Sequence, residues 1–112
     1  MGRPEERDEL LRGTLYLLIL KTLVREPMHG WGIAERIQAI SEDALTVEEG
    51  SLYPALQRML LKGWVTAEWG LSQNNRRARY YSITAAGRRQ LELELSQYSR
   101  VTGAIAKVLA TA

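Results

Sequence analysis

The chain of 112 residues contains no cysteine, one histidine and three prolines. The absence of cysteine excludes disulfides, thiolate metal sites and cysteine nucleophiles. The histidine, His29, has no acidic residue at the spacing of a metal site or a catalytic triad, so a local hydrogen bond or a role at a helix start is expected for it. The sequence also lacks a glycine-rich phosphate loop and paired acids beside a candidate base. We therefore expect neither an enzyme nor a bound cofactor or metal.

Long apolar runs are missing as well. The longest, Leu15–Leu20, is too short to cross a bilayer. The polar start, Met1–Arg7, does not have the pattern of a signal peptide. An apolar content of 46% and a charged content of 25% are typical of a soluble globular protein. We expect a cytoplasmic protein with no membrane partner.

The net charge of +2 is small, but the charges are distributed unevenly along the chain. Residues 1–50 hold 6 Lys/Arg and 10 Asp/Glu, a balance of −4. Residues 51–112 hold 9 Lys/Arg and 3 Asp/Glu, a balance of +6. A basic second half suggests one face that binds a polyanion. A chance asymmetry in a small protein would give the same totals, so the charge alone assigns no partner.

The stretch Glu49–Gly63 has the period of an amphipathic helix, because Leu52, Leu56, Met59 and Leu60 recur along one stripe. Hydroxyl, phenol, amide and cationic groups on the other face are the donors that contact phosphates and base edges in a DNA groove. An ordinary amphipathic helix with a solvated face has the same pattern. The residues of this outer face are Ser51, Tyr53, Pro54, Gln57, Arg58 and Lys62.

Two patterns disagree about where this helix starts. Thr46 and Glu49 have the spacing of a capping box, which favours an early start. Pro54 favours a later start, because a proline deep in a helix costs about 3 kcal/mol whereas one in the first turn loses no hydrogen bond. The predicted start therefore lies within Val47–Ser51, and Gly63 is expected to end the helix.

Three more helices are expected. The first, about Asp8–Arg25, is apolar on most sides, which predicts contact with its own domain and with a second chain. The second, roughly Trp31–Ile40, follows a turn with two glycines at Met28–Gly32. The last has Thr84 as its cap and runs toward Leu109. Its apolar residues step at heptad spacing, which favours packing on a helix of a partner chain over packing on its own domain. The predicted dimerisation residues are Leu15, Leu18, Leu91, Leu95, Tyr98, Thr102, Ile105 and Leu109.

A β-hairpin is expected between the third and last helices. Trp64–Trp69 alternates apolar and polar residues as a strand does, Gly70–Ala78 is a polar loop, and Arg79–Ile83 is rich in β-formers. We expect the two tryptophans to belong to the core and the hinge of this hairpin. The tip and the return strand carry Arg76, Arg77 and Arg79.

The order of elements is thus helix, helix, helix, hairpin, helix. It predicts a mainly α (α+β) fold, a winged helix-turn-helix with an N-terminal helix and one C-terminal dimerisation helix. In that design the third helix enters the major groove and the hairpin, or wing, lies along the flanking backbone. We expect residues 1–84 to form the DNA-binding domain, including the N-terminal helix, and residues 85–112 to form the dimerisation helix.

Several motifs of the chain occur together in one known family. They are Leu11–Leu15 with Ile19–Leu20, Met28–Ile33, Glu49–Leu56, Gly63–Val65 and Arg79–Gly87. On these motifs the chain resembles the PadR family of bacterial transcriptional regulators over about residues 10–95. The separation between Gly-Ser-Leu-Tyr-Pro and Arg-Tyr-Tyr-x-Ile-Thr-x-x-Gly makes the resemblance specific, and the single terminal helix looks like that of the short-tailed members.

The resemblance implies a homodimer that represses promoters by binding double-stranded operator DNA. In many members a small-molecule effector releases the DNA. The resemblance also implies that Tyr53 and Arg79 touch the DNA backbone. Some members stack flat aromatic ligands on a tryptophan of the terminal helix, where this chain has Tyr98 and no tryptophan. Trp31 replaces the tyrosine usual after His-Gly, so no effector is assigned.

The sequence predicts DNA contacts from both the third helix and the wing. Gln57 suits adenine and Arg58 suits guanine, although either side chain could simply be solvated. A winged-helix module that binds protein rather than DNA is the alternative function, and it would need no basic wing. The predicted DNA-contacting residues are Ser51, Tyr53, Pro54, Gln57, Arg58, Asn75, Arg76, Arg77 and Arg79.

Overall fold

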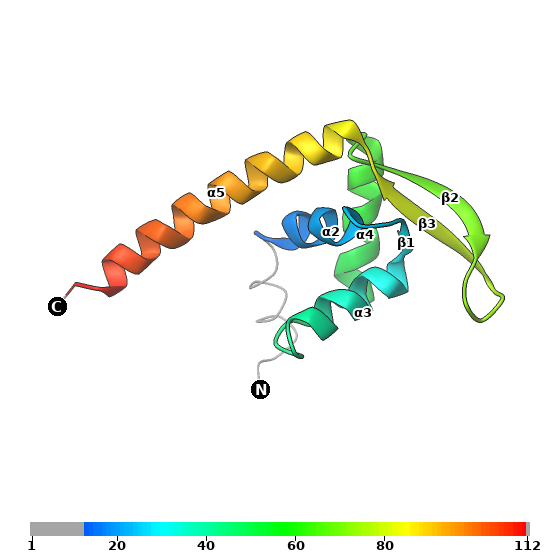
Figure 1. Cartoon of the computed structure of the whole chain (residues 1–112), viewed down its shortest axis with the longest axis horizontal. Helices are drawn as coiled ribbons and strands as arrows, with labels where there is room; N and C mark the ends of the chain where they lie inside the picture. The colour runs from blue at the N-terminus through cyan, green and yellow to red at the C-terminus, as the bar shows by residue number, and fades with distance from the viewer. Residues whose placement is uncertain (1–12, 112) are drawn as a thin grey trace.

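The computed structural model describes residues 13–111 and confirms a mainly α winged helix-turn-helix. Three helices pack together, the β2–β3 hairpin projects from one side of them, and α5 extends from the other side as a long arm (Figure 1). The elements in chain order are α2 (Leu15–Leu23), β1 (Met28–His29), α3 (Gly30–Ile40), α4 (Glu49–Leu61), β2 (Val65–Leu71), β3 (Arg77–Ile83) and α5 (Ala85–Leu109).

The core lies where α2, α3 and α4 meet the base of the hairpin. Helix α2 is buried on several sides, as its all-round apolar pattern predicts. It ends at Leu23, two residues before the predicted end, and the predicted residues 8–12 lie outside the described part. The largest fully buried side chains are Ile19, Leu20, Leu23, Ile33, Leu52, Leu56, Met59 and Val65.

His29 starts helix α3. Its Nδ1 atom accepts a hydrogen bond from the backbone N–H of Gly32 at 3.0 Å, so the imidazole occupies the N-cap position. This confirms the helix-start role predicted for the histidine. The helix begins at Gly30, one residue earlier than predicted. Because Nδ1 accepts, the ring in this arrangement carries its proton on Nε2.

Helix α4 begins at Glu49, inside the predicted range, but the predicted capping box is wrong. Glu48 rather than Thr46 occupies the cap position. Pro54 is therefore the sixth helical residue, so its missing N–H removes a bond beyond the first turn. At the other end Gly63 has a φ of +76°. The N–H groups of Gly63 and Trp64 donate to the carbonyls of Leu60 and Met59, which completes a Schellman motif and confirms the predicted end.

The sheet has the order β1-β3-β2, and all of its pairs are antiparallel. Strands β2 and β3 are both longer than predicted, so the predicted nine-residue loop shrinks to residues 72–76. The N–H of Asn75 donates to the carbonyl of Ser72 at 2.9 Å, and Asn75 has a φ of +60°, a left-handed conformation that asparagine tolerates. The sequence did not predict β1, which pairs Met28 with Tyr81 and His29 with Tyr80.

Thr84 joins the start of α5 to the end of α4. Its Oγ1 accepts from the N–H of Gly87 at 3.0 Å, as predicted for a cap, and donates to the carbonyl of Gly63 at 2.7 Å. Its own N–H donates to the carbonyl of Trp64 at 3.0 Å. Gly87 lies so close that a Cβ atom there would be 2.1 Å from the Trp64 carbonyl oxygen. This junction fixes the direction in which α5 leaves the core.

Only the first part of α5 packs on the core. Leu91 is buried against the chain's own core, as is Leu15 of α2. Every described residue from 95 to 111 is exposed, so the helix continues without a partner in this chain. Leu15 and Leu91 were predicted to face a second chain, but both pack in the core of their own chain. Leu18 is half-buried.

Two glycines of α5 give a stability test of the junction. Gly87→Ala should lower the free energy of unfolding by about 3 kcal/mol, because the new methyl group clashes with the Trp64 carbonyl. Gly103→Ala is the matched control, since nothing lies within 4 Å of its Cβ position. It should raise the free energy of unfolding by about 0.5–1 kcal/mol through helix propensity. Urea unfolding measures both, and a neutral Gly87→Ala would contradict the packing described.

Candidate nucleic-acid interface

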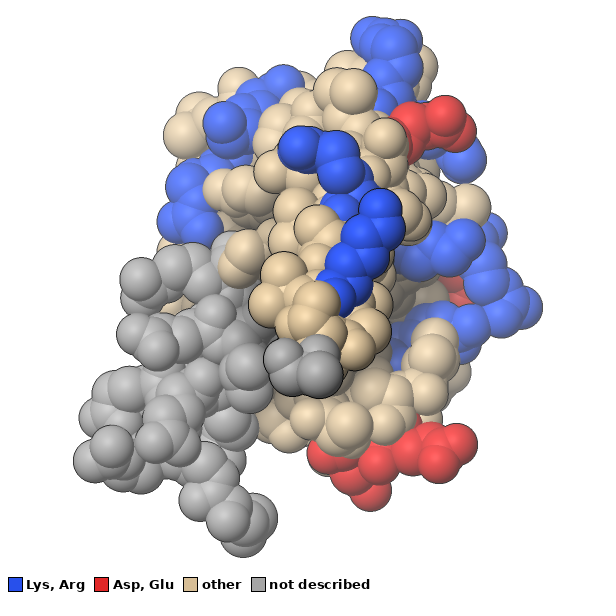
Figure 2. Space-filling view, turned by 90° about the vertical axis from the view of Figure 1, so that its left-hand side faces the viewer, with Lys and Arg blue, Asp and Glu red and all other residues tan. Residues whose placement is uncertain are grey.

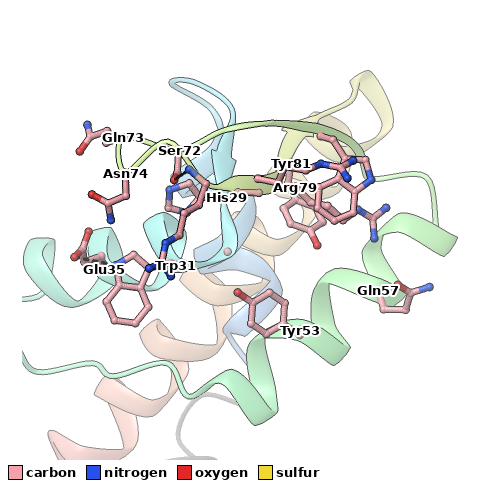
Figure 3. Close-up of a pocket in the computed structure, with 15 residues that line it drawn as sticks. His29, Trp31, Glu35, Tyr53, Gln57, Ser72, Gln73, Asn74, Arg79 and Tyr81 are labelled. Atoms are coloured by element: carbon pink, nitrogen blue, oxygen red, sulfur yellow. Dashed lines mark hydrogen bonds between the residues drawn. The ribbon is translucent and has the colours of Figure 1, made fainter.

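A concavity of about 850 Å³ separates helix α4 from the wing. Tyr53 points from α4 into this space, Gln57 lies one turn further along the helix, and Glu35 of α3 lies at the far end (Figure 3). We call this concavity the cleft. It is lined by His29, Gly30, Trp31, Glu35, Tyr53, Gln57, Trp69, Ser72, Gln73, Asn74, Arg76, Arg77, Ala78, Arg79 and Tyr81.

The strand register determines which side chains of the wing face the cleft. Trp69 pairs with Arg79, and Leu71 pairs with Arg77. Paired residues share one face of a sheet, so these side chains lie on the same face as the buried Tyr81 at the base of the wing. The guanidinium of Arg77 lies 4.6 Å from the centre of the Trp69 ring, and that of Arg79 lies 5.9 Å from the centre of the Tyr81 ring.

The two hairpin tryptophans differ in their surroundings. Trp64 is half-buried, and its ring meets that of Tyr16 edge to face at 5.2 Å, as expected for a residue of the core and hinge. For Trp69 the prediction is wrong, because 61% of its surface is exposed. Its strand runs out of the core toward the tip, so the inward face of β2 changes from buried at Val65 to open at Trp69.

Tyr53 forms the floor of the cleft together with Gly30. A Cβ atom on Gly30 would lie 2.7 Å from Cε1 and the hydroxyl oxygen of Tyr53, so the ring packs directly on the helix backbone. Tyr53 remains 44% exposed, but the partial burial of its phenol raises the pKa above the ordinary 10.0, and the nearby Glu49 and Tyr81 raise it further. A phenol is protonated at neutral pH even at its ordinary pKa of 10.0, so the hydroxyl can donate a hydrogen bond into the cleft.

The structure separates the two residues predicted to read bases. Gln57 lines the cleft, whereas Arg58 does not. The Nε of Arg58 donates to the hydroxyl of Tyr16 at 2.6 Å, and its guanidinium lies 5.7 Å from that ring. Five residues of helix turn Arg58 by about 140° from Tyr53. Arg58 therefore occupies the opposite edge of the exposed face of α4, beside α2.

The remaining predicted residues divide between the cleft and its surroundings. Arg76, Arg77 and Arg79 line the cleft, which brings the whole basic cluster of the wing to one surface. The structure does not bring the other three into the cleft lining. Asn75 forms the wing turn, Pro54 is exposed on α4, and Ser51 is half-buried.

Sequence reasoning did not select several residues that line the cleft. Trp31 is 62% exposed, and its Nε1 donates to the Glu35 carboxylate at 3.2 Å. Trp31 and Glu35 are four residues apart, the spacing that places two side chains together on a helix. The predicted helix would therefore have allowed this pairing to be predicted from the sequence. Gln73 and Asn74 lie in the loop that the sequence predicted, but as uncharged residues they were not selected as contacts, and the structure places both in the cleft lining.

Among residues 13–111, no group of three or more His, Asp or Glu side chains could hold a metal ion. None of the helices in this part combines the length and hydropathy needed to span a bilayer.

The transcriptional regulator PadR-like family matches residues 19–93 of the chain. The protein belongs to this family. Its fold is similar to a PadR-like transcriptional regulator from Bacillus cereus, at 26% identity and a TM-score of 0.78, covering 93% of this chain and 99% of that one. It is also similar to a PadR family regulator from Eggerthella lenta, at 29% identity and a TM-score of 0.78, covering 96% of this chain and 92% of that one.

Two further proteins are similar to the chain in sequence. An uncharacterized protein X from Lysinibacillus sphaericus is 25% identical over 95 residues, covering 85% of this chain and 87% of that protein. An uncharacterized protein of a Streptomyces fradiae transposon is 34% identical over 89 residues, which are 80% of this chain and 24% of that protein. Because the family consists of transcriptional regulators, this PadR-like protein is a regulator of transcription and not an enzyme.

The packing of Tyr53 on Gly30 predicts a pH-dependent result. The difference in absorbance titration between wild type and Tyr53→Phe should give a phenol that ionises above pH 10.0, because burial disfavours the phenolate. Gly30→Ala should push the ring toward solvent and lower this pKa. Gly32→Ala is the control, since its Cβ would meet only the His29 ring, at 3.4 Å. If the pKa of Tyr53 were the same in wild type, Gly30→Ala and Gly32→Ala, the packing of Tyr53 on Gly30 would be contradicted.

Proposed function

We propose that the protein is a homodimeric repressor that binds double-stranded operator DNA through helix α4 and the β2–β3 wing of each copy. One observation carries the proposal. The cleft places Tyr53 and Gln57 of α4 opposite Arg77 and Arg79 of the wing. A winged helix uses these same two elements to hold one segment of a duplex. The family supports DNA as the partner.

The chemistry of the cleft suits a phosphate backbone. Three arginines line it, and Glu35 is the one acidic residue among its described lining residues. Guanidinium groups pair with phosphate oxygens, often through two hydrogen bonds. The protonated hydroxyl of Tyr53 adds a neutral donor of the kind that fixes a protein on the backbone. A DNA strand passing between α4 and the wing would meet all of these groups.

Helix α4 presents its exposed side beside the cleft, in the position of a recognition helix. Gln57 offers an amide that can pair bidentately with adenine. Arg58 lies at the other edge of the exposed face, where its bond to Tyr16 orients the guanidinium. We propose that Arg58 contacts the second wall of the major groove, as a guanine reader or a phosphate partner. Ser51 and Pro54 lie on the same exposed side of the helix, outside the cleft.

We propose that α5 forms the dimer. The helix is roughly 37 Å long, and its exposed apolar stripe has no cover in the described chain. Figure 2 shows the molecule from the end at which α5 terminates. On this side, uncharged surface lies between the Lys and Arg side chains. Leu15 and Leu91 belong to the chain's own core and are not part of this exposed stripe. Its exposed members are Leu95, Tyr98, Val101, Thr102, Ile105, Val108 and Leu109.

A two-fold dimer of this kind would carry two α4 helices. We expect them to enter successive major grooves about 34–36 Å apart and to read an inverted repeat. Occupying such a site would block a promoter, which is the repressor role that the family resemblance suggests. Residence in the cytoplasm and a small-molecule effector belong to the same proposal, and the chemistry of the effector is left open.

The wing contacts predict a change in salt dependence. Arg77→Ala and Arg79→Ala should each lower the slope of log K against log salt by about one, because each removes one phosphate contact and its released counterion. Arg100→Ala on exposed α5 is the matched control and should leave the slope unchanged. The slope is measured by fluorescence anisotropy at several salt concentrations, with labelled DNA from upstream of the gene that encodes this chain. No binding of wild type at low salt would favour the protein-binding module instead.

The α5 stripe predicts the oligomeric state. Wild type should sediment with twice the mass of one chain, and Ile105→Glu should sediment as a single chain, because a carboxylate would be buried at the seam. Leu93→Glu is the matched control, since Leu93 is 65% exposed but lies off the stripe. A wild-type protein that sediments as one chain at micromolar concentration would contradict the dimer.

A further inference from the structure

We infer that Trp69 is a positioning residue of the wing, which holds the guanidinium of Arg77 over the cleft in the orientation that a phosphate requires. The inference rests on the proposed DNA binding and adds to it a residue that acts through its neighbour. It explains why a large aromatic side chain stands 61% exposed near the tip of a hairpin, outside the core.

The register brings the two side chains together. Arg77 pairs with Leu71, so Trp69 is its diagonal neighbour on the same face of the hairpin. Diagonal neighbours on a sheet are within reach of aromatic and long side chains. The separation of 4.6 Å between the guanidinium carbon and the ring centre is the shortest of the four cation–π contacts in the described chain.

The stack leaves Arg77 able to bind. A guanidinium lying over an indole uses its flat face, and its N–H groups point outward in the plane where they can pair with a phosphate. No ion pair with an acidic side chain of residues 13–111 competes for it in the structure. An arginine side chain that projects freely into solvent otherwise loses rotamer freedom when it binds. The indole removes part of that loss before the DNA arrives.

The effect should be specific to Arg77. Arg79 lies nearer the base of the wing and packs over Tyr81, which is buried. Arg76 belongs to the turn and has no aromatic contact among the described residues. Trp31 is the other exposed tryptophan of the cleft, and its Nε1 is bonded to Glu35. Trp31 therefore provides a control of the same residue type on the same surface.

The test is a double-mutant cycle on DNA binding. The probe is a fluorescein-labelled duplex selected by wild-type protein from a random library. Trp69→Leu should weaken binding about twofold to fivefold, the worth of one exposed cation–π contact. Trp69→Tyr keeps a ring and should retain most of the affinity. Arg77→Ala should weaken binding more, and Trp69→Leu added to Arg77→Ala should cause little further loss, because the residue it positions is already gone.

The control cycle pairs Trp31→Leu with Arg77→Ala, and the two losses should multiply. Multiplying losses for Trp69→Leu and Arg77→Ala would overturn the inference, since Trp69 would then act on its own. An unchanged affinity in Trp69→Leu would overturn it as well. In the free protein, the NMR signals of the Arg77 δ-methylene should carry a ring-current shift that disappears in Trp69→Leu. If wild type binds no duplex, the proposed function fails, whereas a missing ring-current shift removes the stack alone.

Discussion

The ring of Tyr53 rests on the backbone of Gly30, and the rest of the cleft depends on this contact. It fixes how closely α4 approaches the first turn of α3, because no side chain separates them. The residues just before Gly30 form β1, which pairs with β3 of the wing. One point of the molecule thereby sets both the angle between the two helices and the direction of the hairpin. The phenol is left partly buried, protonated and directed at the space between them.

A second junction, around Thr84 and Gly87, relates the cleft to α5. The backbone at Trp64, where the wing begins, bonds directly to the cap of the last helix. The wing and the proposed dimer helix therefore start from one rigid corner of the core (Figure 1). If two α5 helices pair, the positions of the two clefts follow from this corner. The spacing of the DNA half-sites is then a property of the fold and needs no flexible linker.

The parts that local patterns specify could be predicted from the sequence. The stripe of α4 and the caps at His29 and Thr84 each depend on residues close together in the chain. The rest depends on distant neighbours. The helix period turns Arg58 away from Tyr53, but its hydrogen bond to Tyr16, 42 residues away, could not be read from the sequence. The alternation of apolar and polar residues predicts which side chains share a face of β2. It does not predict where the strand leaves the core, so the prediction that Trp69 belongs to the core and hinge was wrong. Strand β1 is two residues long and has no period to detect.

The central claim is that DNA backbone lies in the cleft between α4 and the wing. Because the chain has no cysteine, Asn74→Cys gives one attachment point at the wing tip for an iron–EDTA reagent that cuts nearby DNA. On the selected duplex, this variant should cut the backbone in two short patches related by the symmetry of the site. Gly103→Cys on α5 should not cut. Uncut DNA from a bound Asn74→Cys protein, or equal cutting from both positions, would contradict the account.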